Sequence, residues 1–245
     1  CNRMAGSISI LSIDGRDVKL VKTVPLMDAK TLLSHMAVSP DGATGVATRN
    51  GDAKATVLRL GPDSVAEKAT LDVAPRPYAV SITPDGKFAV VASLGDPKGN
   101  GVFTVVDLSG DAPKFVGTVD IGYENLEGAM MSGDGRWVAG VAHAGSTRPK
   151  DAPQFKPNGM VMLYRLDGGK LTGQTFQRRF VNLAFAIGLI RLASVAMKIA
   201  HHLGDRDRIA RIDLGFVFLG AAAPHGAFHT RAALQGRQRG FHALA

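Results

Sequence analysis

The sequence contains few cysteines and aromatic residues, and this scarcity limits the structures that it can form. Cys1 is the only cysteine among 245 residues, so the chain can make no internal disulfide. Aromatic residues make up 6% of the chain, with a single tryptophan. Glycine is abundant instead, at 29 residues, and the apolar runs between glycines and prolines are short. This composition favours strands joined by tight turns over long helices.

Motifs that would name a reaction are missing as well. The sequence has no Gly-x-Ser-x-Gly nucleophile motif, no phosphate-binding glycine loop, no His-Glu-x-x-His and no Cys-x-x-Cys. A calcium loop would need several oxygen ligands at regular spacing, and none is visible. We therefore predict no cofactor and no metal site.

The net charge of +8 is concentrated in one part of the chain. Ten of the 29 lysines and arginines, but only three of the 21 acidic residues, lie after residue 171. Residues 1–171 are therefore almost neutral. Because binding to nucleic acid requires clustered basic side chains, we predict no nucleic-acid partner for this part.

An internal repeat organises residues 1–171. Three segments align without gaps: HMAVSPDG at 35–42, AVSITPDG at 79–86 and GAMMSGDG at 128–135. Their aspartates, Asp41, Asp85 and Asp134, are 44 and 49 residues apart, which is the period of a four-stranded propeller blade. Proline presets the turn in the first two copies, aspartate bonds to the local backbone, and glycine adopts a conformation that other residues resist.

The segments between the turns complete the unit. A second apolar strand follows each turn, then a loop rich in glycine, asparagine and aspartate, a third strand and a more polar fourth strand. The expected second strands are 44–48, 87–93 and 136–143; the third strands are 7–13, 55–60, 102–108 and 160–166; the fourth strands are 18–24, 66–73 and 114–121. Several strands are apolar on both faces, as stacked blades require. We predict an all-β fold, a β-propeller with about three and a half blades of four antiparallel strands, cut from a longer protein at the N-terminus.

The repeat resembles that of a known family. Val-Ser-Pro-Asp-Gly at 38–42, Ile-Thr-Pro-Asp-Gly at 82–86 and Thr-Val-Val-Asp-Leu at 104–108 resemble the YVTN repeat of bacterial seven-bladed lactonase-like propellers. The second strands depart from the family's Val-Ala-Asn, because Thr48, Ser93 and His143 follow Val-Ala in this chain and only Asn2 fits. The resemblance implies seven blades and export to the periplasm. It carries no catalytic residue across, because its motifs encode turns and packing.

The candidate site lies where the loops converge on the propeller channel. The residue seven places before the turn aspartate is Ser34, Tyr78 or Glu127, and His35 follows Ser34. Arg49 and His143 end second strands on the same rim. These six residues are the predicted ligand-binding set, with solvated loop residues and structural histidines as the alternative. The long loop at 144–159 is a second candidate for recognition.

The remaining residues, 172–245, form a basic tail that lacks the repeat. It holds five of the seven histidines and nine arginines but one lysine. Two interpretations stay open: a shifted reading frame in a GC-rich gene, or an appended helical or disordered segment. Arg191 and Lys198 interrupt its apolar stretch at 181–203, so we predict no membrane span.

For function, the clean repeat without a catalytic constellation favours a binding protein. We predict that its channel face receives a small molecule or a protein partner. The alternative is a lactonase-like hydrolase that acts on lactones of sugar acids. A quinone- or metal-dependent dehydrogenase is disfavoured because neither a tryptophan-rich docking motif nor a set of metal ligands is present.

Overall fold

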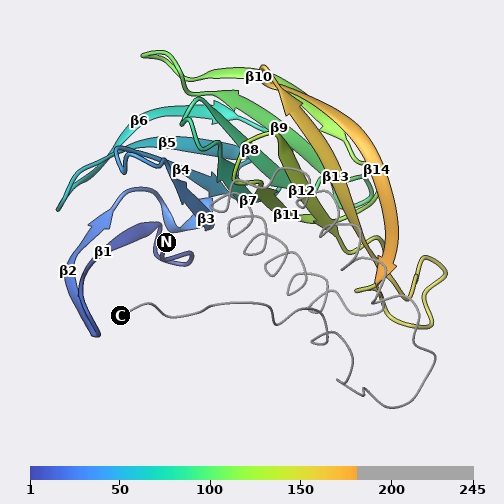
Figure 1. The fold of residues 1–245 in the computed structure, drawn as a ribbon. Coiled ribbons are helices and arrows are strands. Elements are labelled where there is room, and N and C mark those ends of the chain that lie inside the picture. The colour runs from blue at the N-terminus through green and yellow to red at the C-terminus, as the bar shows by residue number, and fades with distance from the viewer. Residues whose placement is uncertain (181–245) are drawn as a thin grey trace, which may run out of the picture.

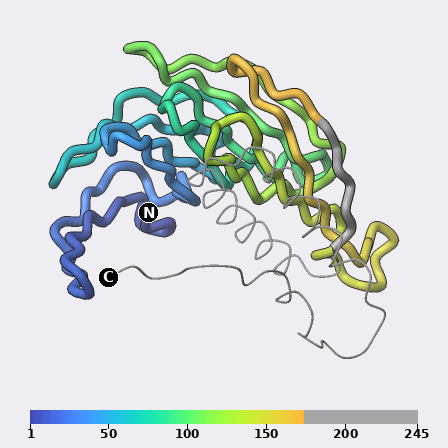
Figure 2. The backbone as a smooth tube through the Cα atoms, in the orientation of Figure 1, coloured from blue at the N-terminus to red at the C-terminus, as the bar shows by residue number. Residues whose placement is uncertain are grey.

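The computed structural model describes residues 1–180, including the side chains up to residue 173, and shows four units that follow one another along an arc (Figures 1 and 2). The first unit is a two-stranded antiparallel sheet, β1 (Ser7–Asp14) and β2 (Asp17–Pro25). A short 3-10 turn, Ala29–Thr31, leads from it into three four-stranded antiparallel sheets. The arrangement is that of consecutive propeller blades, which confirms the predicted fold class.

Each four-stranded blade is built in chain order. The first contains β3 (Leu33–Val38), β4 (Thr44–Arg49), β5 (Lys54–Leu60) and β6 (Val65–Asp72). The second contains β7 (Pro77–Ile82), β8 (Phe88–Ser93), β9 (Val102–Asp107) and β10 (Lys114–Asp120). The third contains β11 (Leu126–Met131), β12 (Trp137–Ala142), β13 (Gly159–Asp167) and β14 (Lys170–Phe180). In Figure 1 the first strands β3, β7 and β11 lie on the inside of the arc, and β6, β10 and β14 lie on the outside.

The two ends of the arc match the sequence pattern to different degrees. Strands β1 and β2 take the place of the third and fourth strands of a blade, as predicted. Strand β14 pairs with β13 and extends to Phe180, past residue 171 where the repeat was no longer readable. The expectations for residues 181–245 lie outside the described residues.

The hairpin turns between first and second strands repeat one hydrogen-bond network. In each blade a serine or threonine hydroxyl donates to the turn aspartate, at 2.5 Å for Ser39–Asp41 and at 2.6 Å for Thr83–Asp85 and Ser132–Asp134. The same carboxylate accepts a backbone N–H two residues later, at 3.0–3.1 Å. The following glycines have φ between +72° and +74°, the left-handed region that favours glycine. The predicted turn chemistry is therefore present in all three copies, including the one without proline.

The apolar core lies between the blades. One cluster joins the two-stranded unit to the first blade through Ile8 and Leu33. A second joins the first and second blades, and a third places Phe103 of the second blade against β12 and β13. Phe103 is fully buried and meets Tyr164 edge to face, with ring centroids 5.3 Å apart. The second blade is thus covered by a neighbouring blade on each side, which explains the pattern at 88–92, whereas in the third blade Met162 packs against its one described neighbour.

The structure has no helix long and apolar enough to cross a membrane among the described residues.

Candidate functional site

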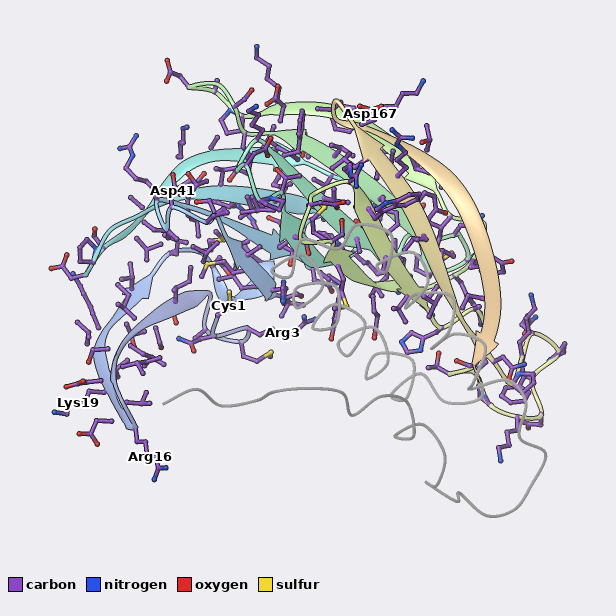
Figure 3. The ribbon with its side chains drawn as sticks, in the orientation of Figure 1. Cys1, Arg3, Arg16, Lys19, Asp41 and Asp167 are labelled. Carbon is purple, nitrogen blue, oxygen red and sulfur yellow. The ribbon has the colours of Figure 1, made fainter. Side chains whose placement is uncertain are left out.

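The candidate site lies at one edge of the blades, where first strands begin and second strands end. Because these strands are antiparallel, Leu33 lies opposite Arg49, Pro77 opposite Ser93, and Leu126 opposite Ala142. The aspartate turns occupy the other edge. Arg3 belongs to the first edge because it contacts Ser34, whereas Asp41 follows the other end of β3; both are labelled in Figure 3. We call the first edge the rim.

A β-bulge interrupts the start of every first strand. The register shifts between Leu33 and Met36 in β3, between Pro77 and Ala79 in β7, and between Leu126 and Gly128 in β11. The residues inside these bulges include the three predicted at equivalent positions: Ser34, Tyr78 and Glu127. An extra residue re-aims its side chain relative to the regular pleat. The bulge is therefore the backbone feature that gives these side chains their common place on the rim.

In the third blade the rim brings two of the predicted residues together. The Nε2 atom of His143 lies 3.0 Å from Oε1 of Glu127. The His143 side chain is 15% exposed and that of Glu127 is 33% exposed. The other ring nitrogen of His143, Nδ1, is buried and has no hydrogen-bond partner among the described residues. Glu127 and His143 thus form a carboxylate–imidazole pair at the rim, in which the carboxylate is the more exposed partner.

The other four predicted residues are not joined to one another by side-chain hydrogen bonds or ion pairs within the described residues. Ser34 accepts a hydrogen bond from Arg3, and the exposed His35 bonds through its backbone N–H to Thr48. Tyr78 is 37% exposed, and its backbone carbonyl accepts the Thr48 hydroxyl at 2.8 Å.

Arg49 has a partner of its own. Its guanidinium pairs with Asp52 in its own loop. The six residues therefore line one edge, but the structure joins only Glu127 and His143 directly.

The hydrogen-bond register also corrects one alignment made from the sequence. Thr48, Ser93 and His143 each follow Val-Ala, yet they are not equivalent in the sheets. Counted from the turn aspartate, the equivalents of His143 are Asn50 and Leu94. The backbone N–H groups of all three equivalents bond to the carbonyl of the residue just before the first strand. Asn50 is thus the asparagine that ends a second strand, and counting nine residues from each aspartate would have found it.

Two arginines on the rim were missed by the sequence analysis. Arg3 donates to the side chains of Ser34 and Asn50. Arg76 has φ of +53° and donates from Nε to the Gly95 carbonyl at 2.6 Å. Both guanidiniums bond only to neutral oxygens and form no ion pair within the described residues.

The contacts of Arg76 extend into the next blade. Its Nη2 atom reaches the Asp96 carbonyl at 3.1 Å and Oδ1 of Asn125 at 3.5 Å. Asn125 lies two residues before Glu127, and its carbonyl accepts the N–H of His143 at 3.1 Å. A cationic group of the second blade therefore contacts the segment of the third blade that leads into Glu127 and bonds the backbone of His143. The repeat could not predict the contact between Arg76 and Asn125, because Arg76 lies outside the repeated motif.

The long loop at 143–158 is joined by an ion pair to the segment just before β11. Arg148 donates to both carboxylate oxygens of Glu124, from Nε at 2.9 and 3.1 Å. This hydrogen bonding, together with the charges of Arg148 and Lys156, lowers the pKa of Glu124. Arg148 therefore balances the charge of Glu124, whereas no lysine or arginine forms an ion pair with Glu127 within the described residues.

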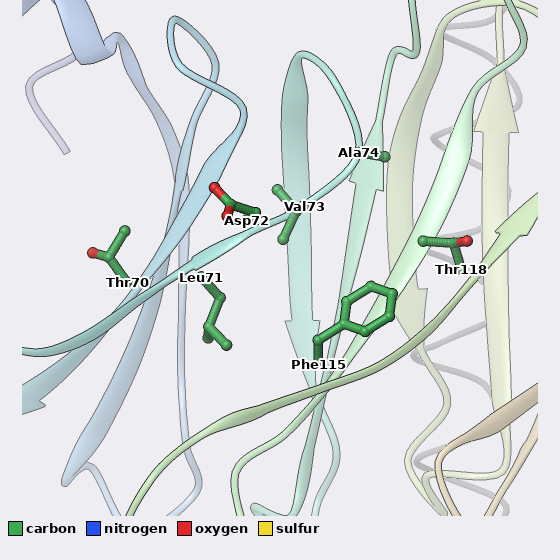
Figure 4. A pocket seen from close by; sticks show the side chains of 7 residues that line it. All are labelled: Thr70, Leu71, Asp72, Val73, Ala74, Phe115 and Thr118. Atoms are coloured by element: carbon green, nitrogen blue, oxygen red, sulfur yellow. The ribbon is translucent and has the colours of Figure 1, made fainter.

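Neither of the two cavities described in the structure is lined by any of the six predicted residues. One, of about 610 Å³, runs between the outer strands β6 and β10 and is shown in Figure 4; it is lined by Thr70, Leu71, Asp72, Val73, Ala74, Phe115 and Thr118. The other, of about 450 Å³, lies between the aspartate turns of the second and third blades. Within residues 1–180 no group of three or more histidine, cysteine or acidic side chains could hold a metal ion.

Comparison with known proteins identifies solved structures that share the fold. No protein-family model and no curated protein matches the sequence. Solved structures do match it. A Lactobacillus plantarum protein is 15% identical with a TM-score of 0.54, covering 72% of this chain and 52% of that one. A candidate 6-phosphogluconolactonase from Bacteroides fragilis is 18% identical with a TM-score of 0.52, covering 72% and 52%.

A third match is a Pseudomonas aeruginosa periplasmic gluconolactonase, 18% identical with a TM-score of 0.51, covering 70% of this chain and 50% of that one. At these identities the likeness shows the fold alone. Structures described as lactonases are thus among the neighbours, whereas membership of the YVTN repeat family stays a prediction. The chain spans about half the length of the structures that it matches.

Proposed function

We propose that the rim binds a small polyhydroxylated acid, such as a sugar acid or its lactone, at the junction of the second and third blades. The observation that carries this proposal is the Arg76 guanidinium, which forms no ion pair within the described residues and reaches the side chain of Asn125, two residues before Glu127. A guanidinium recognises a carboxylate through two parallel hydrogen bonds, and a carboxylate accepts hydrogen bonds from sugar hydroxyls. The half-exposed ring of Tyr78 offers an apolar face to a sugar ring at the equivalent position of the second blade.

A binding measurement on the full-length protein tests this proposal. Calorimetry with gluconate should give saturable binding, with uncharged sorbitol much weaker because it has no carboxylate for Arg76. Arg76→Gln should weaken gluconate binding about ten-fold or more, since hydrogen bonds to charged groups contribute about 1.5–3 kcal/mol. Arg136→Gln, on the opposite edge, is the matched control and should bind like the unchanged protein. Equal affinities for gluconate and sorbitol would contradict the assignment.

Hydrolysis of a sugar-acid lactone is a second candidate, favoured by the lactonase descriptions of the structural neighbours. In this reaction Glu127 would take a proton from water as the water oxygen attacks the lactone carbonyl. Arg76 would stabilise the oxyanion, and cleavage of the ring C–O bond would return the proton to the departing alkoxide. The product is the open hydroxy acid, so water is the only co-reactant.

The two candidates differ in one measurement. Titration of the acid released from glucono-1,5-lactone at constant pH should exceed the spontaneous rate only if the rim is catalytic. Glu127→Gln should then abolish the excess even at saturating lactone, whereas Arg136→Gln should leave it unchanged. A rate equal to the spontaneous one would leave the binding function alone.

We also propose that the protein works outside the cytoplasm, as the resemblance implied. The periplasmic location stated for the Pseudomonas aeruginosa neighbour is consistent with this proposal. Release of the full-length protein by osmotic shock would support it, and retention with cytoplasmic enzymes would refute it.

A further inference from the structure

The Glu127 side chain owes its place to a backbone irregularity, so a second group is needed to fix its direction. Glu127 occupies the bulge between Leu126 and Gly128, where it has no regular cross-strand neighbour. Bulge residues are aimed by the local backbone, but a glutamate keeps several side-chain rotamers. The group that limits this freedom is the ring of His143, 3.0 Å away.

His143 is itself held rigidly. Its backbone N–H bonds to the Asn125 carbonyl at 3.1 Å, and the following N–H of Ala144 bonds to the Glu124 carbonyl at 3.2 Å. These two bonds tie the end of β12 to the segment that leads into Glu127. The imidazole is mostly buried, and it presents Nε2 to the carboxylate while Nδ1 points away from every acceptor in the described residues.

We infer that His143 is a positioning residue that holds Glu127 on the rim by donating a hydrogen bond from Nε2–H to its carboxylate. Only a protonated Nε2 can form this hydrogen bond, because an ionised carboxylate has no proton and acts only as an acceptor. A proton on Nδ1 would be a buried donor without an acceptor, which costs about 1–3 kcal/mol. The geometry therefore selects one tautomer of two.

The neighbouring charged groups among the described residues are engaged elsewhere. Glu124 is occupied by both donor groups of Arg148, and Arg76 is directed to carbonyl and amide oxygens. No other described side chain donates to Glu127. The assignment of a ligand to Glu127 rests on the proposed function. The Glu127–His143 contact and the tautomer of His143 do not depend on it.

Nitrogen-15 NMR of the protein labelled at histidine tests the tautomer directly. The spectrum should show one His143 nitrogen that carries a proton and couples to it, with the shifts of the Nε2–H form; the signal is assigned by its loss in His143→Gln. Signals of the Nδ1–H form, or averaged signals of both forms, would overturn the inference whether or not any ligand binds.

Two variants test the positioning role through gluconate affinity. His143→Gln keeps an N–H donor at a similar reach and should bind gluconate within about three-fold of the unchanged protein. His143→Leu keeps the bulk, removes the donor and should bind about ten-fold more weakly. A merely structural histidine would make both variants equal in affinity once their folding is verified, and that result would refute the role. If the unchanged protein binds no gluconate, the proposed function fails while the NMR result still decides the tautomer.

Discussion

Replacement of Phe103 by alanine is the sharpest test of how the blades hold together. Phe103 belongs to the second blade, is fully buried, and contacts the third blade through Tyr164 and β12. The contact is so close that a Cβ atom on Gly140 would lie 2.8 Å from the end of the Phe103 ring. Alanine would leave a cavity between two blades, and such changes cost about 3–5 kcal/mol.

Part of this free energy belongs to the aromatic pair itself. Edge-to-face rings contribute about 0.5–1.5 kcal/mol beyond the buried area. Phe103→Leu removes the ring edge but retains most of the volume, so it should cost about 1.5 kcal/mol or less. The milder variant keeps the test measurable if the alanine variant does not fold.

Urea unfolding of the full-length protein, followed by the fluorescence of Trp137, measures both changes. Trp137 is the only tryptophan among these 245 residues and begins β12, so its fluorescence reports on the blade that Phe103 contacts. Phe115→Ala is the matched control, because Phe115 is 53% exposed on β10 and its loss should change stability by about 0.5 kcal/mol or less. Equal unfolding midpoints for Phe103→Ala and Phe115→Ala would refute the view that inter-blade packing stabilises the fold.

Three further outcomes follow from the turns and the blade interface. Gly86→Ala should cost about 1–2 kcal/mol in the same urea assay, because Gly86 has φ of +72° and a Cβ there meets nothing, so the cost is conformational. Gly140→Ala should cost about 1–3 kcal/mol through overpacking against Phe103, and the combination with Phe103→Leu should recover part of it; simple additivity would contradict this contact. The Thr83 hydroxyl and the Lys87 N–H lower the pKa of Asp85, so the unfolded chain takes up the proton at higher pH than the folded one. The stability that this carboxylate contributes should be present above about pH 4 and lost as the pH falls through its folded pKa; Asp85→Asn should flatten that part of the pH profile, and an unchanged profile would refute the assignment.

The sequence was sufficient for the blades because their information is local. Asp85 acts on residues within three positions of itself, and the same spacing recurs around Asp41 and Asp134. Apolar alternation then identified the strands, whose bounds in the structure differ by a few residues from those expected. The last strand was the exception, since the apolar pattern fades after Leu171 although pairing with β13 continues.

The candidate site could be predicted only as a set of positions. The position shared by Ser34, Tyr78 and Glu127 follows from counting along the repeat. The contact between Glu127 and His143 does not, because it depends on which residue the bulge leaves unpaired. Arg76 could not be found at all, since its partners come from a loop of its own blade and from the next blade.

The extra residue at the start of each inner strand separates pairing within the sheet from recognition by the side chain, two requirements that usually conflict in a protein. Pairing within the sheet is carried by the residues on either side of it, so its own side chain is free to vary without disturbing the ladder. The three described copies hold a hydroxyl, a phenol and a carboxylate at this one place. A chain with this design can exchange its recognition chemistry one group at a time, while the scaffold beneath stays unchanged.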